Sequence, residues 1–307
     1  MKCHFPSLKP GDTVALVCAS SRCYSEQDPM ATKTYLEAQG FRVIYREECY
    51  SYVPVVKKAR IFLDYLLDDQ IKMIWALRGG EGCADLLPIL EAHKADIQTA
   101  KPTLLFGFSD FTAVLNYFMF RYDWPVVHGM VAVQFVRDFV DEQSNTLSLS
   151  VVRGETGYCI DDLRPLNQAG IAFQAIQAVC CGGNLALLNI SIGDLWQFDP
   201  ADKIVIIEDV GEMAYQLIRT LKYLQRIGFF KKAKAVIFGD FNGRLRGATA
   251  AEQEKESDDI KRYLGYFAES VNFPVLHTNK IGHGAINYPV IFNYPAVLSA
   301  DGRLSFT

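Results

Sequence analysis

Apolar and polar residues occur in alternating blocks along the first half of the chain. Apolar residues at helical spacing predict helices, as over Val56–Leu67 and Phe111–Tyr122. Another helix is expected to begin at the pair Asp28 and Pro29, as N-cap and first residue, and to stop before Gly40. Strand and helix thus alternate, which predicts an α/β fold with a parallel sheet and helices on both faces. Five short apolar runs supply the predicted strands: Thr13–Ala19, Phe41–Arg46, Ile71–Leu77, Thr103–Gly107 and Pro125–His128.

The second half has a different pattern, and a polar, weakly periodic stretch around residue 150 separates it from the first. We therefore predict two domains, residues 1–150 and 165–307. Apolar residues recur at helical spacing over Met213–Leu224, and the charged segment Ala251–Tyr266 predicts a solvated helix. The tail from Pro274 onward predicts several short strands. Further strands are expected over Ala175–Cys181, where Gly182, Gly183 and Asn184 follow, and over Lys203–Glu208 and Ala235–Gly239.

Composition and charge exclude several classes of protein. The 307 residues include 31 basic and 35 acidic side chains, which leaves no basic excess for a dedicated nucleic-acid binder. No stretch approaches the about 20 consecutive apolar residues that span a membrane, and the first 11 residues lack the pattern of a secretory signal. Eight cysteines without CxxC pairs predict reduced thiols in the cytoplasm. With five histidines and no HExxH motif, we expect no metal and no cofactor.

Ser109 is the first candidate for chemistry. The segment from Gly107 to Asp110 follows an apolar strand and precedes an apolar helix, which is the setting of a nucleophile elbow. There, a sharp turn exposes the serine Oγ above the sheet, and the N–H of the next residue can face an oxyanion. The GxSxG pattern is incomplete, because Phe111 stands where the second glycine would be. The alternative interpretation is a serine that only caps the helix.

The second candidate is the glycine-rich segment Arg78–Gly82, which follows another predicted strand. Glycine at a strand end lets the backbone approach a ligand closely, so Gly79 or Gly80 could direct an N–H at an oxyanion or a phosphate. The segment is not GxGxxG, and the chain contains no GxxxxGK[ST] motif, so nucleotide binding has little support. An ordinary tight turn remains the alternative.

A nucleophilic serine needs a base, and two histidines could serve. His283 lies between two glycines in a predicted loop, whereas His128 ends a predicted strand in the first half. An acid to orient the imidazole could be Glu208, at the end of an apolar strand, with Asp209 and Glu212 as adjacent alternatives. Each of these residues could equally be a solvated surface group.

In combination, these segments resemble the ordered landmarks of the LD-carboxypeptidases, the S66 serine peptidases. The resemblance covers nearly the whole chain and departs from the family at two places. The family typically has Tyr at the position of Glu81, and Pro between the equivalents of Gly129 and Met130. The landmarks are Ala76–Gly82, Gly107–Asp110, Val127–Met130, Gly182–Asn184, Ile207–Asp209 with Glu212, and Gly282–Gly284.

The resemblance implies a flavodoxin-like N-terminal α/β domain that carries Ser109, and a smaller C-terminal α/β domain, with a β-rich tail, that carries Glu208 and His283. Ser109 would be the nucleophile, His283 the general base and Glu208 the residue that orients it. Further roles are expected at the glycine turn and beside the nucleophile: the N–H groups of Gly80 and Asp110 form the oxyanion hole, and Arg78 and Gly79 bind substrate.

The activity implied by the resemblance is that of a muramoyltetrapeptide carboxypeptidase. Such an enzyme hydrolyses the amide between an L-centre, diaminopimelate or Lys, and a terminal D-Ala of murein tetrapeptides during cytoplasmic cell-wall recycling. We expect a homodimer that binds murein peptide, and neither nucleic acid nor a membrane. Arg78, Arg219 and Lys280 are the candidate cations for the substrate carboxylate.

Two other functions stay open at this point. Relatives of the microcin-immunity type cleave a peptide–nucleotide amide and tend to carry an additional loop with aromatic residues that stack on a base. The comparable segment here, Ser191–Ala201, is short and contains Trp196 and Phe198. The other alternative is a non-catalytic α/β module that binds a small anion through Ser20, Ser21 and the glycine turn.

Overall fold

The computed structural model describes residues 5–137, 139–242 and 248–306 of the chain. Its first half forms five parallel strands in the spatial order β2-β1-β3-β4-β5, which is the order of flavodoxin-like folds. This confirms the predicted parallel sheet. The strands are β1 (Thr13–Val17), β2 (Arg42–Ile44), β3 (Ile71–Ala76), β4 (Leu104–Gly107) and β5 (Val126–His128).

Helices connect and cover these strands, because each parallel crossover needs a segment long enough to return to the same edge of the sheet. The first-half helices are α1 (Gln27–Ala38), α2 (Val55–Leu66), α3 (Cys83–Ala92), α4 (Lys94–Thr99), α5 (Thr112–Tyr122) and α6 (Glu142–Val152). Short 3₁₀ helices occupy Glu47–Cys49, Ser109–Phe111 and Ala132–Val136. The apolar pattern located α2 and α5 to within a residue, but it gave no indication of α3, α4 or α6.

The second half adds three longer strands and their helices to the same sheet. Strands β8, β9, β10 and β11 are parallel, and β7 pairs antiparallel with β11 at the edge. The strands are β7 (Arg164–Pro165), β8 (Ile176–Asn184), β9 (Ile204–Val210), β10 (Ala235–Asn242) and β11 (Val275–His277). The helices are α7 (Gln168–Ala172), α8 (Leu185–Ile190), α9 (Ala214–Arg226) and α10 (Ala250–Glu269).

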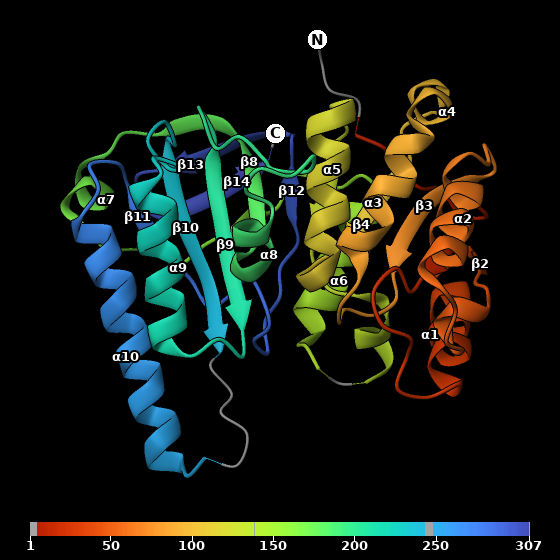
Figure 1. The fold of residues 1–307 in the computed structure, drawn as a ribbon, viewed down its shortest axis with the longest axis horizontal. Coiled ribbons are helices and arrows are strands. Elements are labelled where there is room, and N and C mark those ends of the chain that lie inside the picture. Colours follow the sequence, from red (N-terminus) through yellow and green to blue (C-terminus); the bar gives the residue numbers. More distant parts are fainter. Residues whose placement is uncertain (1–4, 138, 243–247, 307) are drawn as a thin grey trace.

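The tail of the chain joins the two halves. Strand β12 (Val290–Phe292) pairs antiparallel with β5 of the first half and parallel with β8 of the second. The sheet therefore continues from one half into the other (Figure 1). The remaining short strands, which confirm the β-rich tail, are β6 (Cys159–Ile160), β13 (Pro295–Ser299) and β14 (Arg303–Phe306). The proposed division into domains 1–150 and 165–307 stays a prediction.

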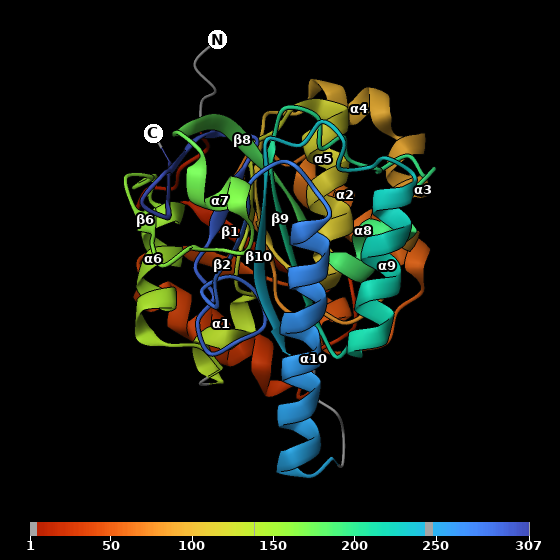
Figure 2. The same cartoon turned by 90° about the vertical axis from the view of Figure 1, so that its left-hand side faces the viewer.

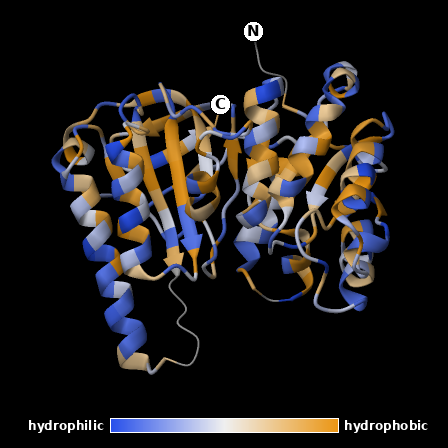
Figure 3. Cartoon of the chain, in the orientation of Figure 1, coloured by the Kyte–Doolittle hydropathy of each residue, from blue (hydrophilic) through white to orange (hydrophobic). Residues whose placement is uncertain are grey.

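Helices lie on both faces of the sheet, with α8 and α9 on one side and α1 and α6 on the other (Figure 2). The strands are hydrophobic, whereas α10 is largely hydrophilic, as its charged sequence predicts (Figure 3). Only one stripe of α10, which includes Ile260, Leu264 and Phe267, is buried. In the ranges that the structure describes, none of the helices is long and apolar enough to cross a lipid bilayer.

Two predicted boundaries are wrong. Helix α1 begins at Gln27, so Asp28 and Pro29 lie within its first turn rather than at its start. The Asp28 carboxylate has other partners: it accepts a hydrogen bond from the Ser25 N–H at 3.1 Å and forms an ion pair with Arg137 at 2.6 Å. Strand β8 also continues through Gly182 and Gly183 to Asn184, although the sequence pattern predicted that the strand would end at Cys181.

These glycines continue the strand because β9 and α5 approach it too closely for side chains. A Cβ on Gly182, whose φ is +124°, would lie 2.0 Å from the carbonyl oxygen of Ile206. A Cβ on Gly183 would lie 2.6 Å from the Thr112 side chain. Glycine thus permits the close packing of the two halves at this point.

We expect Gly182→Ala to lower the free energy of unfolding by about 2–5 kcal/mol, because the new methyl group combines a steric clash with an unfavourable positive φ. A denaturant titration measures the change. Gly265→Ala is the matched control: Gly265 lies within α10 with no atom within 4 Å of the added Cβ, so the substitution should stabilise by about 0.5–1 kcal/mol. Equal midpoints for the two variants would contradict the packing of β8 against β9.

Candidate active site

Ser109 lies directly beyond β4, at the carboxyl end of the strand. It is the first residue of the short 3₁₀ helix Ser109–Phe111, and its φ is +60°, a strained value for a residue with a side chain. A Cβ on Gly107 would lie 2.7 Å from both Ala76 Cβ and the Phe111 ring, so the turn requires glycine there. This is the geometry of a nucleophile elbow. The interpretation of Ser109 as an N-cap is wrong, because Phe108 holds the cap position and Ser109 makes no capping bond.

The glycine turn after β3 packs against Ser109. A Cβ on Gly79 would lie 3.2 Å from Ser109 Oγ. The Asp110 carboxylate links the two turns, because it accepts a 2.9 Å hydrogen bond from the N–H of Cys83, where α3 begins. Burial raises the pKa of Asp110. The N–H of Asp110 has no intrahelical acceptor, since it lies in the first turn of the 3₁₀ helix. The two predicted oxyanion donors, Gly80 and Asp110, therefore lie on adjoining turns.

Glu208 and His283 contact each other, although 75 residues separate them in sequence. Glu208 is fully buried in β9, and His283 lies in the loop between β11 and β12 with 16% of its side chain exposed. Glu208 Oε2 and His283 Nδ1 are 2.6 Å apart. The loop approaches the strand through Gly282, where φ is +118° and a Cβ would lie 3.0 Å from Glu208 Cβ. Glycine beside the histidine thus makes the contact possible.

Glu208 and His283 each favour the charged form of the other. Burial by itself favours the neutral imidazole, but the Glu208 carboxylate and its hydrogen bond raise the pKa of His283 above its ordinary value. Burial likewise opposes ionisation of Glu208, but His283 outweighs it and lowers the pKa of the carboxyl group. With Nδ1–H donating to Glu208, the second ring nitrogen, Nε2, is left as a proton acceptor.

His128, the competing base, lies in the core below this pair. It is fully buried, stacks on Phe292 at 5.4 Å and meets the edge of Phe108 at 6.0 Å. Within the described residues, neither of its ring nitrogens has a hydrogen-bond partner, and burial lowers its pKa to about 4. His128 is therefore neutral near pH 7 and lacks the paired carboxylate that His283 has.

The serine and the histidine meet at the same edge of the sheet. The ring of Phe108, the residue before Ser109, lies 4.5 Å from the ring of His283. Among the described residues, the structure gives no hydrogen bond between Ser109 and His283. Such bonds commonly form or shorten only when substrate binds. The structure thus places His283 in contact with Glu208 and with Phe108, the residue next to Ser109.

Asp209, an alternative orienting acid, has another role. Its carboxylate accepts hydrogen bonds from the Asn184 side chain and from the Ala186 N–H, each at 2.9 Å. Burial raises its pKa to about 7. Asp209 thus holds the start of α8 close to β9 instead of orienting His283. The sequence singled out Asn184 only as part of a motif, although an Asn before an apolar segment is a typical N-cap, and Asn184 does accept from the Leu187 N–H at 3.2 Å.

Of the three candidate cations, only Arg78 adjoins the glycine turn. Lys280 forms an ion pair with Asp161, and Arg219 lies on the outer surface of α9. The Arg78 guanidinium stacks on the ring of Tyr24, 3.5 Å from its centroid, and donates a hydrogen bond to a neighbouring carbonyl. Arg78 is therefore held in place next to the glycine turn that packs against Ser109.

Other sequence expectations bear on the alternative functions. Trp196 and Phe198 are both buried, and Phe198 packs on Phe120 and Phe229, so neither ring is available to stack on a nucleobase.

The described cysteines are free thiols, and Cys3 lies outside the described residues. Within those residues, no group of three or more His, Cys, Asp or Glu side chains is placed to hold a metal ion.

Known proteins resemble this chain in sequence and in fold. Residues 14–129 match the LD-carboxypeptidase N-terminal domain, and residues 177–298 match the LD-carboxypeptidase C-terminal domain. The murein tetrapeptide carboxypeptidase of Pseudomonas aeruginosa is 32% identical over 237 residues, which cover 75% of this chain and 73% of the relative.

Two solved structures illustrate the shared fold. The muramoyltetrapeptide carboxypeptidase from Oxalobacter formigenes has a TM-score of 0.78 at 20% identity, over 95% of this chain and 97% of its own. An MccF-like protein from Streptococcus pneumoniae, solved in complex with AMP, has a TM-score of 0.81 at 17% identity, over 97% and 99%.

Proposed function

Since the chain belongs to the LD-carboxypeptidase family of S66 peptidases, we propose that it is a serine carboxypeptidase that releases the terminal D-Ala of murein tetrapeptides. The observation that carries the proposal is the 2.6 Å contact between His283 and the buried Glu208, next to a strained Ser109. A carboxylate, an imidazole and a half-buried serine in this arrangement are the parts of an acyl-transfer site.

The proposed reaction has two stages. His283 Nε2 accepts the Ser109 proton as Oγ attacks the carbonyl carbon of the scissile amide, which is worth about 10²–10⁴-fold. The carbonyl oxygen becomes an oxyanion and accepts from the N–H groups of Gly80 and Asp110, with each such donor worth about 2.7–4 kcal/mol. His283 then returns the proton to the leaving amine of D-Ala. A water molecule cleaves the acyl-enzyme by the same route and restores Ser109.

The free carboxylate of D-Ala needs a cation, and Arg78 and Gly79 are the groups we propose for this end of the substrate. The family supports murein peptide as the substrate class. We further expect cytoplasmic cell-wall recycling as the setting, a homodimer as the assembly, and no role for nucleic acid or a membrane. Size-exclusion chromatography with light scattering tests the expected dimer.

We expect the protein to release D-Ala from L-Ala-γ-D-Glu-meso-diaminopimelate-D-Ala, and chelation of metals with EDTA to leave the rate unchanged, because the proposed site uses only side chains and backbone N–H groups. Chromatographic quantification of free D-Ala measures both. The control for stereochemistry is the same tetrapeptide with L-Ala in place of the terminal D-Ala. Absence of D-Ala release from folded protein would contradict the proposal and favour a peptide–nucleotide amide, or a non-catalytic anion-binding role, instead.

A further inference from the structure

The loop that carries His283 runs from residue 278 to residue 289, between β11 and β12, and contains neither helix nor strand. Its two ends are joined, because the Tyr288 N–H donates to the Lys280 carbonyl oxygen at 2.7 Å. The mechanism proposed above uses one contact of this loop, the one between His283 and Glu208. The other hydrogen bonds of the loop have no role in it so far.

The side chain of Asn287 spans this loop from within. Asn287 is fully buried, and its Oδ1 accepts a hydrogen bond from the Gly282 N–H at 3.3 Å. Gly282 directly precedes His283 and is the residue at which the loop approaches Glu208. A buried amide that accepts from the backbone restricts that backbone, because the N–H would otherwise be left without a partner. Asn287 therefore fixes the chain immediately before the histidine.

The first turn of α6 is bonded to the same loop. The Asn287 N–H donates to the Ser144 hydroxyl at 2.9 Å, and Ser144 is itself fully buried. The Ser144 hydroxyl in turn donates to the carboxylate of Asp141, the N-cap of α6. The Asp141 N–H donates to the Ala285 carbonyl oxygen at 2.9 Å. Two backbone groups of the histidine loop are thus bonded to a helix of the first half.

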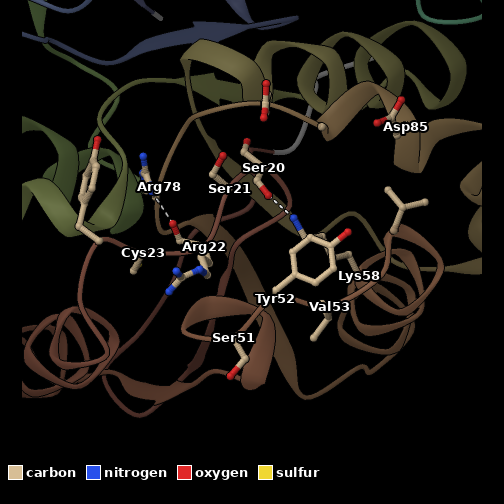
Figure 4. Close-up of a pocket in the computed structure, with 14 residues that line it drawn as sticks. Ser20, Ser21, Arg22, Cys23, Ser51, Tyr52, Val53, Lys58, Arg78 and Asp85 are labelled. Atoms are coloured by element: carbon tan, nitrogen blue, oxygen red, sulfur yellow. Dashed lines mark hydrogen bonds between the residues drawn. The ribbon is translucent and has the colours of Figure 1, made fainter.

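The base is held by contacts between the two halves, whereas the glycine turn is held within one. Arg78, beside the turn, donates a hydrogen bond to the Arg22 carbonyl oxygen, and both residues belong to the first half (Figure 4). The 2.6 Å contact between His283 and Glu208 lies in the second half, but its loop is bonded to α6. Misplacement of a catalytic group by about 1 Å can lower a rate about 10²-fold. The hydrogen bonds to α6 therefore bear directly on catalysis.

We propose that Asn287 and Ser144 are positioning residues for the base: through them, α6 holds the His283 loop in the conformation that sets Nδ1 against Glu208. The inference rests on the proposed function. Both residues act through His283. The half of the chain that carries the nucleophile thus also holds the base in place, so the triad is complete only when the two halves pack together.

The first test removes the acceptor for the Gly282 N–H. Asn287→Ala should lower kcat for D-Ala release about 10²-fold and leave KM within about twofold, because His283 acts in the chemical step. Asn287→Asp is the conservative variant, since it keeps Oδ1, and the Nδ2 that it replaces has no hydrogen-bond partner among the described residues. It should recover most of the lost turnover, although its buried charge lowers the midpoint of a denaturant titration. A purely structural role predicts instead that turnover falls with the midpoint.

The second test compares two serines of α6. Ser144 and Ser148 are both buried and lie one turn apart, but Ser148 Oγ has no hydrogen-bond partner in the described part of the chain. Ser144→Ala keeps the N-cap bond from its N–H to Asp141, at 3.0 Å, so α6 should stay folded. We expect Ser144→Ala to lower kcat about tenfold, because the Asn287 N–H loses its acceptor, and Ser148→Ala to leave kcat unchanged.

Proton NMR gives a measurement that needs no substrate. The downfield signal of the His283 Nδ1–H bonded to Glu208, assigned by its loss in Glu208→Gln, should shift or weaken in Asn287→Ala and Ser144→Ala, but not in Ser148→Ala. An unchanged kcat or an unchanged signal in both variants would overturn the inference. If Asn287→Ala does not fold, the comparison of Ser144→Ala with Ser148→Ala decides. If the wild type releases no D-Ala, the proposed function fails, whereas the NMR signal still decides whether α6 positions His283.

Discussion

Ser109→Ala should lower the turnover of D-Ala release by about 10⁶-fold and leave the free energy of unfolding within about 0.5 kcal/mol of the wild type. Loss of a nucleophile that acts together with its base removes nearly the whole chemical contribution of the triad. Stability should hold because Ser109 makes no helix-capping hydrogen bond, and alanine meets the same strain at φ +60° as serine does. Steady-state kinetics and a denaturant titration measure the two effects.

Ser148→Ala is the matched control for this variant. Ser148 is a buried serine of α6 whose Oγ has no hydrogen-bond partner among the described residues. Its replacement should leave turnover unchanged. A serine-directed fluorophosphonate should label the wild type and Ser148→Ala, but not Ser109→Ala. If Ser109→Ala kept its turnover, the assignment of the nucleophile would be wrong.

Glu208→Gln should lower kcat/KM by about 10³–10⁴-fold at neutral pH, because a neutral amide no longer holds the correct tautomer of His283 or stabilises its charged form. The pH profile should change as well. His283 must be neutral to accept a proton, so kcat/KM of the wild type rises with pH through the pKa of His283, which Glu208 raises. Without the carboxylate, burial dominates and lowers this pKa, so the acid limb should move to lower pH.

Glu212→Gln provides the comparison, since Glu212 is the nearby acid that the sequence left as an alternative. It should alter neither the rate nor the acid limb. Measurements of kcat/KM from pH 5 to pH 9 on all three proteins separate a positioning role from a structural one. An acid limb that stays in place in Glu208→Gln would contradict the assignment of Glu208 as the partner of His283.

Local sequence patterns predicted much of the sheet. Buried parallel strands must be apolar on both faces, so β1, β3, β4 and β9 stand out as apolar runs. Helix α6 did not stand out, because its Ser-rich sequence carries a weak apolar stripe. Strand β8 was truncated because glycine usually interrupts strands, and only the contact with Ile206 explains why glycine continues this one.

The sequence by itself determined the succession of the five strands of the first half, and with it the edge of the sheet where Ser109 and the glycine turn lie, because strand ends in a parallel sheet share an edge. It could not choose between His128 and His283, since a histidine at a strand end and a histidine in a loop can each reach a site at the edge of a sheet. The tertiary structure favours His283: pairing of β12 with β5 and β8 buries His128 among aromatic rings, and the loop before β12 brings His283 onto Glu208. Contacts between residues 75 positions apart depend on how the chain closes in space, which no local pattern of apolar and polar residues records.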